Sequence, residues 1–483
     1  QLLKLNFFAG AAGSVPGALF AEKLIEKMPG LSRVYYCNSG SEANEKAFKM
    51  VRQIAHKKYG GKKYKVLYRD RDYHGTTIAA LSAGGQDERN AQYGPFTPGF
   101  VRVPHCLEYR AQWDLSGEEY GKRAADAIEE VILSEGPDTV GGLCLEPVTA
   151  GGGVITPPEG YWDRVQEICQ KYDILLHIDE VVCGLGRTGT WFGYQNYGIK
   201  PDMVTMAKGV ASGYAAIACL VTTEEVFDSF KDNPDDKMNY FRDISTFGGC
   251  TAGPTAAIEN MRIIEDENLL ENTVKMGARM MDNLDNLAEK HPVVGDVRGS
   301  GLFCGAELVK DRKTKEPEDE KSVQAVVADC AAQGVLIGAT NRSLPGLNNT
   351  LCFSPALIAT PDDIDQMAER HLERVLVDVR AARGHVREDH RQAQLEEAVA
   401  CDRARREHHR RAQRRVKSAV CRFPIKKACV GFEACVRFRK VGSSFGETGE
   451  RDQRGRGAGG VGPGASQMQT FALTDYYVLG ETA

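Results

Sequence analysis

The chain has 483 residues, which is enough for two or three domains with a large buried core. Hydrophobic residues make up 42% and charged residues 26%, as in an ordinary soluble globular protein, and the net charge of -5 argues against a general polyanion binder. The 14 cysteines are scattered singly, with no C-x-x-C pair or Cys/His cluster, so we expect neither a metal site nor a disulfide framework.

The first 21 residues (QLLKLNFFAGAAGSVPGALFA) look only faintly like a signal peptide. They contain one basic residue, have Gly and Pro in the middle and lack an initiator Met. We interpret them as part of the first domain, and the chain as an N-terminally truncated piece. No stretch of the chain reaches the roughly 18 uninterrupted apolar residues of a transmembrane helix, so no membrane partner is expected.

Short apolar runs alternate with amphipathic helical patterns through residues 1–257. The Ser41–Lys57 pattern has one apolar face and ends at Gly60, and Glu159–Tyr172 is a second such helix. The predicted strands are Val34–Cys37, Lys65–Arg69, Gly142–Glu146, Ile174–Ile178, Met203–Met206 and Ile217–Val221. This alternation predicts a large three-layer α/β domain with a mixed, mostly parallel sheet.

The pattern changes in residues 258–380, where we predict a smaller α+β domain. It should contain a long helix, a strand-like segment and a further helix: Thr273–His291, Val297–Leu308 and Val323–Gln333. A last helix should start at Pro361, with Thr360 as its N-cap and two acids in its first turn. One face of that helix would carry Ile364, Met367, His371, Val375 and Val379.

Residues 381–483 differ in composition from the rest of the chain. Cys401–Lys417 holds eight Lys/Arg against two acids, and Arg454–Gly464 is Gly-rich (RGRGAGGVGPG). Apolar periodicity is nearly absent, so we predict a disordered, basic and Gly-rich tail. Arg-rich segments can contact nucleic-acid phosphates, but this one lacks aromatic interleaving, and no nucleic-acid partner is expected.

Two charged residues follow buried strands in the first domain. Lys208 follows an apolar strand and precedes Gly209, and a dry pocket at such a place would lower the pKa of the lysine and make it nucleophilic. Asp179 ends LLHID, where burying an acid costs free energy unless the acid is paired. Taken singly, each has a commoner explanation: a solvated lysine at a strand end, and a capping or loop acid.

Two further segments suggest a phosphate and a planar ring. Asn38–Glu42 (NSGSE) lies between a strand and a helix, where free N–H groups and the positive end of the helix dipole can bind phosphate. Tyr73 precedes His74-Gly75, and an aromatic ring beside a glycine turn can stack on a flat cofactor. The alternatives are a plain capped helix and a tyrosine that completes the core.

The segment Gly184–Gly189 fits the pattern G-x-G-x-x-G, which in dinucleotide-binding proteins leads from a strand directly into a helix. Here Asp179 and Glu180 intervene after the strand, and the following TWFGYQNYG is not helix-like. We therefore do not predict a dinucleotide site.

At their spacings, several strings together resemble the class III pyridoxal-phosphate aminotransferases. They are NSGSEANEKAFK, YHGTT, LEPV, HIDEVVCGLGRTGTWFG, PDMVTMAKG and STFGG, and the resemblance covers roughly residues 1–380. It implies the fold type I of pyridoxal-phosphate-dependent transferases, which is aspartate-aminotransferase-like, and pyridoxal 5'-phosphate as cofactor.

The resemblance also implies roles for individual residues around the cofactor ring. Lys208 would carry the cofactor and act as the catalytic acid and base. Asp179 would hold the pyridine nitrogen, with Val181 on one face of the ring and Tyr73 on the other. Glu146 would lie near the hydroxyl side of the ring, although a structural acid paired with an arginine is an equal alternative.

The remaining roles concern the phosphate and the substrate. Ser39, Gly40 and Ser41 would bind the phosphate, and Thr246 would reach the phosphate of the neighbouring subunit in a homodimer or homotetramer. Arg342 would bind the acid group of the substrate, since a guanidinium suits both carboxylate and sulfonate. Its loop before Pro355-Ala356 is longer than usual in the family, and an exposed loop arginine is the alternative.

Within the family, FRDISTFGGCTAG, GDVRGSGLFCGAELVKD and IGATNRSLPGLNNTLCFSPALIAT are most similar to members that move the amino group of taurine to pyruvate by ping-pong chemistry. The products would be sulfoacetaldehyde and alanine. The alternatives are another ω-amino donor, such as β-alanine or 4-aminobutyrate, or an inactive scaffold caused by the N-terminal truncation. The scattered cysteines indicate a reducing, cytoplasmic location.

Overall fold

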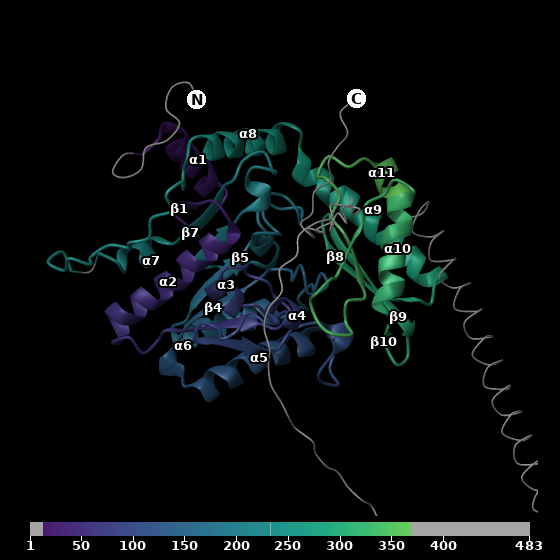
Figure 1. The fold of residues 1–483 in the computed structure, drawn as a ribbon, viewed down its shortest axis with the longest axis horizontal. Coiled ribbons are helices and arrows are strands. Elements are labelled where there is room, and N and C mark those ends of the chain that lie inside the picture. Colours follow the sequence, from purple (N-terminus) through teal and green to yellow (C-terminus); the bar gives the residue numbers. More distant parts are fainter. Residues whose placement is uncertain (1–12, 232, 369–483) are drawn as a thin grey trace, which may run out of the picture. The chain divides into compact units, whose positions relative to one another are not determined.

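The computed structural model describes residues 13–231 and 233–368 (Figure 1). The predicted tail at 381–483, residues 1–12 and the part of the last predicted helix that carries His371, Val375 and Val379 lie outside the described residues. Within these ranges, no helix combines the length and the apolar character that crossing a membrane requires.

The first half of the described chain alternates strands and helices, as the sequence predicts. In chain order the elements are α1 (Val15–Glu26), β1 (Arg33–Cys37), α2 (Gly40–Tyr59), β2 (Lys65–Arg69), α3 (Ile78–Ser82), α4 (Asp87–Asn90), β3 (Phe100–Val103), α5 (Gly117–Glu135), β4 (Val140–Leu145), α6 (Tyr161–Tyr172), β5 (Leu175–Asp179), β6 (Met203–Met206), η4 (Lys208–Val210), β7 (Ala218–Thr222) and α7 (Glu224–Asp228).

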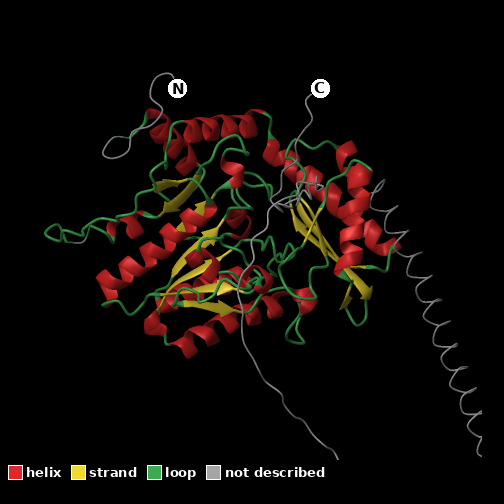
Figure 2. Ribbon diagram, in the orientation of Figure 1, coloured by secondary structure: helices red, strands yellow, loops and turns green. Residues whose placement is uncertain are grey.

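The second half begins with two long helices and continues with short strands. Its elements are α8 (Ala252–Asp266), α9 (Leu269–Lys290), β8 (Val294–Ser300), β9 (Phe303–Asp311), β10 (Glu316–Pro317), α10 (Glu320–Ala332), β11 (Gly338–Ala339), β12 (Thr350–Phe353) and α11 (Pro361–Asp365). Figure 2 shows the strands of the two halves as separate groups with helices around them.

The first sheet has seven strands in the order β1-β7-β6-β5-β4-β2-β3. Neighbours from β3 to β6 run parallel, whereas β7 is antiparallel to both β6 and β1. Every residue of β4 is buried, because helices cover both faces of the sheet, and such strands read as continuous apolar runs. The predicted mixed, mostly parallel sheet is confirmed.

The side chains of β5 show how the three layers form. Leu176 and Ile178 point into a core shared with α5 and α6, which includes Trp162. His177, between them in the strand, points to the opposite face, where its ring lies 6.0 Å from that of Phe48 on α2. Alternation along one strand therefore directs polar side chains of β5 toward α2.

The ends of α2 are set by local sequence. Ser39 is the N-cap, and its hydroxyl accepts the N–H of Glu42 at 3.3 Å. At the other end Gly60 adopts a left-handed conformation with φ 58°, which costs glycine little. The helix therefore extends the predicted Ser41–Lys57 segment by one residue at its start and by two at its end.

The second sheet is antiparallel, in the order β10-β9-β12-β11, with β8 also paired to β9. The prediction of one strand-like segment at Val297–Leu308 was wrong, because β8 and β9 form a hairpin that reverses at Gly301. There φ is +57°, and a Cβ atom would lie 2.6 Å from the backbone of Thr188. Apolar patterning does not reveal such a reversal, since both strands are extended.

A separate apolar cluster lies between the second sheet and its helices α9, α10 and α11. The expected start of the last helix is confirmed: Thr360 caps α11, Pro361 opens it, and the hydroxyl of Thr360 accepts the N–H of Asp363. Helix α8 runs across the predicted boundary between 1–257 and 258–380 and packs on the core of the first sheet. The division into two domains stays a prediction.

Candidate active site

Four parallel strands that are neighbours in the sheet deliver polar side chains to one edge. Tyr73 follows β2, Glu146 follows β4, Asp179 ends β5 and Lys208 follows β6. In sheets of this kind, ligands bind outside the carboxyl ends of the strands. Residues that are far apart in the sequence thus gather where a ligand would bind.

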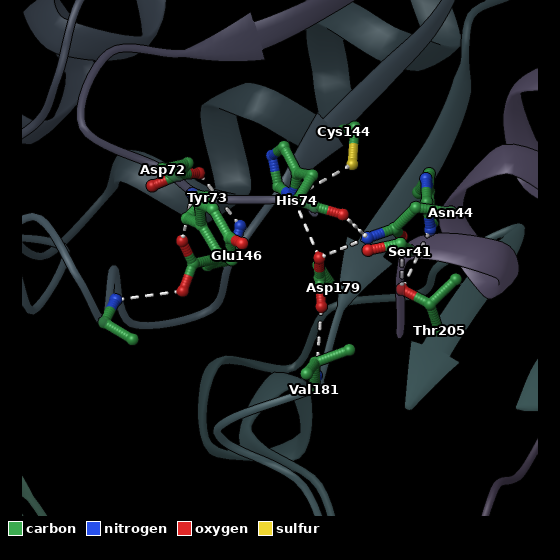
Figure 3. A network of polar contacts seen from close by, with 12 residues as sticks. Ser41, Asn44, Asp72, Tyr73, His74, Cys144, Glu146, Asp179, Val181 and Thr205 are labelled. Atoms are coloured by element: carbon green, nitrogen blue, oxygen red, sulfur yellow. Dashed lines mark hydrogen bonds and ion pairs between the residues drawn. The ribbon is translucent and has the colours of Figure 1, made fainter. Parts of the chain in front are cut away.

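Asp179 lies at the centre of a buried hydrogen-bond network (Figure 3). Its Oδ2 atom lies 2.8 Å from His74 Nδ1 and accepts the side-chain amide of Asn44 at 2.8 Å. Its Oδ1 atom accepts the backbone N–H of Val181 at 3.0 Å. Burial disfavours the charged form, but the bonds from His74, Val181 and Asn44 keep the pKa of Asp179 below its ordinary value.

His74 is the charged counterpart of Asp179. Its side chain is buried, and its Nδ1 atom also lies 3.6 Å from the sulfur of Cys144. Burial alone would disfavour the imidazolium, but Cys144 and Asp179 raise the pKa of His74 well above its ordinary value. The pair therefore holds an ionised carboxylate in a protein interior, where an unpaired one would be costly.

Glu146 is buried and bound by backbone groups. Its two carboxylate oxygens accept the N–H groups of Tyr73 at 2.8 Å and Ala150 at 2.9 Å. Burial, reinforced by Asp72 and Asp179, raises the pKa of Glu146 to about 8. Arg69, the kind of partner that a structural acid would have, donates at 2.7 Å to the backbone carbonyl of Glu146 and binds Asp72 with its side chain.

The N-terminus of α2 meets two other site segments. The hydroxyl of Ser41 accepts the backbone N–H of Thr76 at 3.0 Å, and a Cβ atom on Gly75 would lie 2.5 Å from that hydroxyl oxygen. A Cβ atom on Gly40 would lie 3.0 Å from Val181 and 3.6 Å from Ala207. The two glycines thus let three chain segments converge on the start of the helix.

Lys208 directly follows Ala207, whose side chain lies near Gly40 and Val181. Its φ of 35° is unusual for a residue other than glycine and costs about 1–2 kcal/mol, and such strain clusters at functional sites. The expectation of a dry pocket is not met in the described chain, where the side chain of Lys208 is exposed. The 3-10 turn at Lys208–Val210 turns the chain away from β6, so the lysine does not continue the buried strand.

Tyr73 is half-buried and contacts the guanidinium of Arg89, whose Cζ atom lies 5.1 Å from the centre of the ring. Arg89 also donates to the carbonyl of Asn341 at 3.4 Å. The tyrosine is therefore linked through one arginine to the loop that carries Arg342.

Arg342 and Thr246 are both exposed, and among the described residues neither forms a hydrogen bond with the other predicted site residues. The loop of Arg342 is nevertheless anchored, because the hydroxyl of Ser343 donates to the carbonyl of Gly151 at 2.6 Å. Arg342 has φ 52°, a second strained residue among those predicted. Thr246 lies in the loop that precedes α8.

The sequence predictions assigned no role to three residues of the network, which are Asn44, His74 and Thr205. Asn44 lies on the buried face of α2, and Thr205 lies within β6. A polar residue on an otherwise apolar helix face or strand was the available signal, because such a group needs a partner. The identity of that partner depends on tertiary packing.

The chain belongs to the class III aminotransferases, because a family model described as "Aminotransferase class-III" matches residues 1–376. The family predicted from the sequence motifs is thereby confirmed, and with it the aminotransferase fold. Enzymes of this class are pyridoxal-phosphate-dependent transaminases.

Two relatives carry a more particular description. A hypotaurine/taurine–pyruvate aminotransferase of Paracoccus denitrificans (strain Pd 1222) is 78% identical over 369 residues, which cover 76% of this chain and 80% of the relative. A taurine–pyruvate aminotransferase of Rhodobacter capsulatus is 72% identical with the same coverage.

Solved structures also match. A Bacillus anthracis aminotransferase aligns with a TM-score of 0.75 and 38% identity, over 78% of this chain and 83% of that one. The ω-transaminase of Pseudomonas jessenii, solved in complex with PMP, aligns with a TM-score of 0.73 and 34% identity over the same shares.

Proposed function

We propose that this protein transfers the amino group of taurine to pyruvate, using pyridoxal 5'-phosphate held at the strand edge described above. The observation that carries the proposal is the ionised, buried carboxylate of Asp179, which lies on the same edge as Lys208 and beside the start of α2. The strong similarity to two taurine–pyruvate aminotransferases supports the choice of substrates.

The described residues fit this cofactor. Gly40 and Gly75 leave the backbone open at the N-terminus of a 20-residue helix, where N–H groups and the helix dipole favour a phosphate. Ser39 and Ser41 add hydroxyl groups to this phosphate site. When bound, pyridoxal phosphate would supply an aldehyde that takes up the amino group and a ring that withdraws electrons.

Each residue around the ring would have a separate task. The carboxylate of Asp179, kept ionised by His74, would hold a proton on the ring nitrogen. Glu146, whose raised pKa favours the protonated form at neutral pH, would lie near the ring hydroxyl. Val181 and Tyr73 would pack against the two faces of the ring.

Lys208 would hold the cofactor through its Nζ atom. Once released, the same amine would move a proton from the amino-bearing carbon of the donor to the cofactor, and in the second half-reaction from the cofactor to the acceptor carbon that gains the amino group. The strained backbone of Lys208 and its position directly after Ala207, which lies near Gly40, support this role, because strain is retained where the surrounding structure requires a particular direction of the side chain.

Arg342 would bind the acid group of either substrate. Its guanidinium can form paired hydrogen bonds with the sulfonate of taurine and with the carboxylate of pyruvate, so one arginine serves both half-reactions of a ping-pong cycle. The anchoring of its loop through Ser343 supports this proposal, since a substrate-binding side chain needs a held backbone.

We also propose that the enzyme is a homodimer or a homotetramer, in which Thr246 reaches the phosphate of the neighbouring subunit. The exposure of Thr246 and of nearby apolar side chains, including Phe247 and Ile244, supports an interface at this loop.

Separate domains at 1–257 and 258–380 remain part of the proposal. The cysteines, which are scattered singly along the sequence, support a reducing, cytoplasmic setting.

A donor screen tests this function. The purified full chain is supplied with pyridoxal phosphate and pyruvate, and alanine formation is measured with taurine, hypotaurine, β-alanine and 4-aminobutyrate. We expect the sulfur-containing donors to give the highest kcat/KM. A clear preference for a carboxylate donor would reject taurine but retain the enzyme class, whereas a chain that binds no pyridoxal phosphate would support the inactive scaffold.

A further inference from the structure

A second line of polar side chains approaches Asp179 from inside the sheet, and the reaction proposed above assigns it no task. It consists of His177 on β5, Thr205 on β6 and Asn44 on α2 (Asn44 and Thr205 are labelled in Figure 3). Their side chains are almost fully buried, with exposed fractions of 2%, 0% and 1%. The large majority of polar groups so deeply buried form at least one hydrogen bond.

The register of the sheet brings these groups together. In the parallel pair of β5 and β6, Asp179 lies opposite Thr205 and His177 lies opposite Met203. His177 and Asp179 are two residues apart, so they point to the same face of the sheet, toward α2. There Asn44 lies between Thr205 and Asp179 and contacts both.

The donors and acceptors of Asn44 admit one orientation of its amide. Its Nδ2 group donates to Asp179 Oδ2 at 2.8 Å and to the backbone carbonyl of His74 at 2.6 Å. Both partners are acceptors, so the reversed amide would set its oxygen against two oxygens. The amide oxygen must therefore point the other way, where the hydroxyl of Thr205 donates to it at 2.8 Å.

This orientation also decides the proton position on His177. Because the hydroxyl proton of Thr205 is committed to Asn44, the Oγ1 atom of Thr205 can only accept from His177 Nε2, which lies 3.2 Å away. His177 must then carry its proton on Nε2 and leave Nδ1 bare. Consistently, Nδ1 has no hydrogen-bond partner among the described residues, and burial lowers the pKa of His177 to about 3, which keeps the ring neutral.

We propose that His177, Thr205 and Asn44 form a neutral hydrogen-bond chain of fixed direction, which ends on Asp179 and positions its carboxylate for the ring nitrogen of the cofactor. Each member donates to the next: His177 to Thr205, Thr205 to Asn44, and Asn44 to Asp179. The chain stabilises the ionised carboxylate without adding a second cation beside His74. These three are positioning residues, and their role toward the cofactor rests on the function proposed above.

The first test breaks the chain at its middle. Thr205→Val keeps the shape but removes the hydroxyl, so the amide of Asn44 loses the donor that orients it; Thr205→Ser restores that donor. The matched control is Thr273→Val, since Thr273 is equally buried and its hydroxyl bonds within α9, to the carbonyl of Leu269 at 2.8 Å. The readouts are the dissociation constant of pyridoxal phosphate and the visible absorbance of the loaded protein.

We expect Thr205→Val to bind pyridoxal phosphate about tenfold more weakly, because the amide of Asn44 without its donor would weaken the hydrogen bond that it gives to the charged Asp179. The absorbance spectrum should also change. Thr205→Ser and Thr273→Val should stay within about twofold of the parent protein. Parent-like binding and absorbance in Thr205→Val would overturn the proposal, as would an equal loss in Thr205→Ser.

The second test measures the parent protein itself and needs no cofactor. In parent protein with 15N-labelled histidine, the ring of His177 should be neutral at pH 7, with its proton on Nε2. The signal is assigned by its loss in His177→Gln, which keeps a side-chain donor toward Thr205. A proton on Nδ1, or a charged ring, would refute the chain even if Thr205→Val failed to fold. If the parent binds no pyridoxal phosphate, the proposed function fails, but this measurement still tests the direction of the chain.

Discussion

Replacing Asp179 with asparagine is the sharpest test of the proposed site, because it keeps the shape of the side chain and removes its charge. The carboxylate accepts three hydrogen bonds, from His74 and Asn44 on Oδ2 and from Val181 on Oδ1. An amide has one oxygen, so in either orientation its NH2 group faces at least one of these donors. The substitution therefore produces a mismatch as well as the loss of charge.

The magnitude follows from these contacts. Hydrogen bonds to a charged group contribute about 1.5–3 kcal/mol, against about 1 kcal/mol for neutral ones. Weakening two such bonds by about 1 kcal/mol each, with a further loss of about 1 kcal/mol at the mismatch, gives about 3 kcal/mol. If this loss of free energy weakens the binding of the proton on the ring nitrogen, kcat/KM should fall about 100-fold or more. The factor follows because about 1.4 kcal/mol corresponds to a factor of ten.

The assay is alanine formation from taurine and pyruvate, with circular dichroism and melting temperature as checks of folding. Asp202→Asn is the matched control, because Asp202 accepts the N–H of Leu176 at 2.7 Å near the opposite end of β5. We expect the control to keep its activity within about threefold, because its hydrogen bond lies at the other end of β5 from Asp179. Equal losses in the two variants, or a fully active Asp179→Asn, would refute the reasoning.

Three further predictions concern other residues. After borohydride treatment, intact-mass measurement should find the cofactor attached to the parent chain and not to Lys208→Ala. If the Lys208→Ala chain still carries the mass of the cofactor, another residue holds it. Arg342→Ala should raise the KM for taurine and pyruvate about 10- to 100-fold, as for the loss of a charge-assisted pair, and change kcat/KM little for an amine donor without an acid group; equal effects on both donors would contradict a role in acid recognition. The raised pKa values of Glu146 and Glu180, both about 8 and both caused chiefly by burial, predict a pH effect on stability. The folded protein keeps protons that the unfolded chain has released, so the free energy of unfolding should fall as the pH rises from about 5 to 8, as measured by calorimetry, and a rise over that range would contradict it.

Much of the first sheet could be predicted because its signals are local. The bounds of β2 and β6 match the predicted Lys65–Arg69 and Met203–Met206, since strands buried on both faces are continuous apolar runs between polar breaks. The capped start of α11 at Pro361 could also be predicted, because a helix cap depends on residues that are adjacent in the sequence. The β8–β9 hairpin was missed, because its reversal needs only the positive φ of Gly301 within an extended pattern.

The sequence by itself determined which chemical groups stand after the buried strands: a lysine, an aspartate, a glutamate and a tyrosine, with glycines at the start of α2. Only the tertiary structure decided which of them meet. The pairing of β5 with β6 puts Thr205 beside Asp179, and the packing of α2 places Asn44 between them. Strand register and helix packing are contacts between residues far apart in the chain, so no local pattern encodes that Asp179 takes partners from α2 and from the segment after β2.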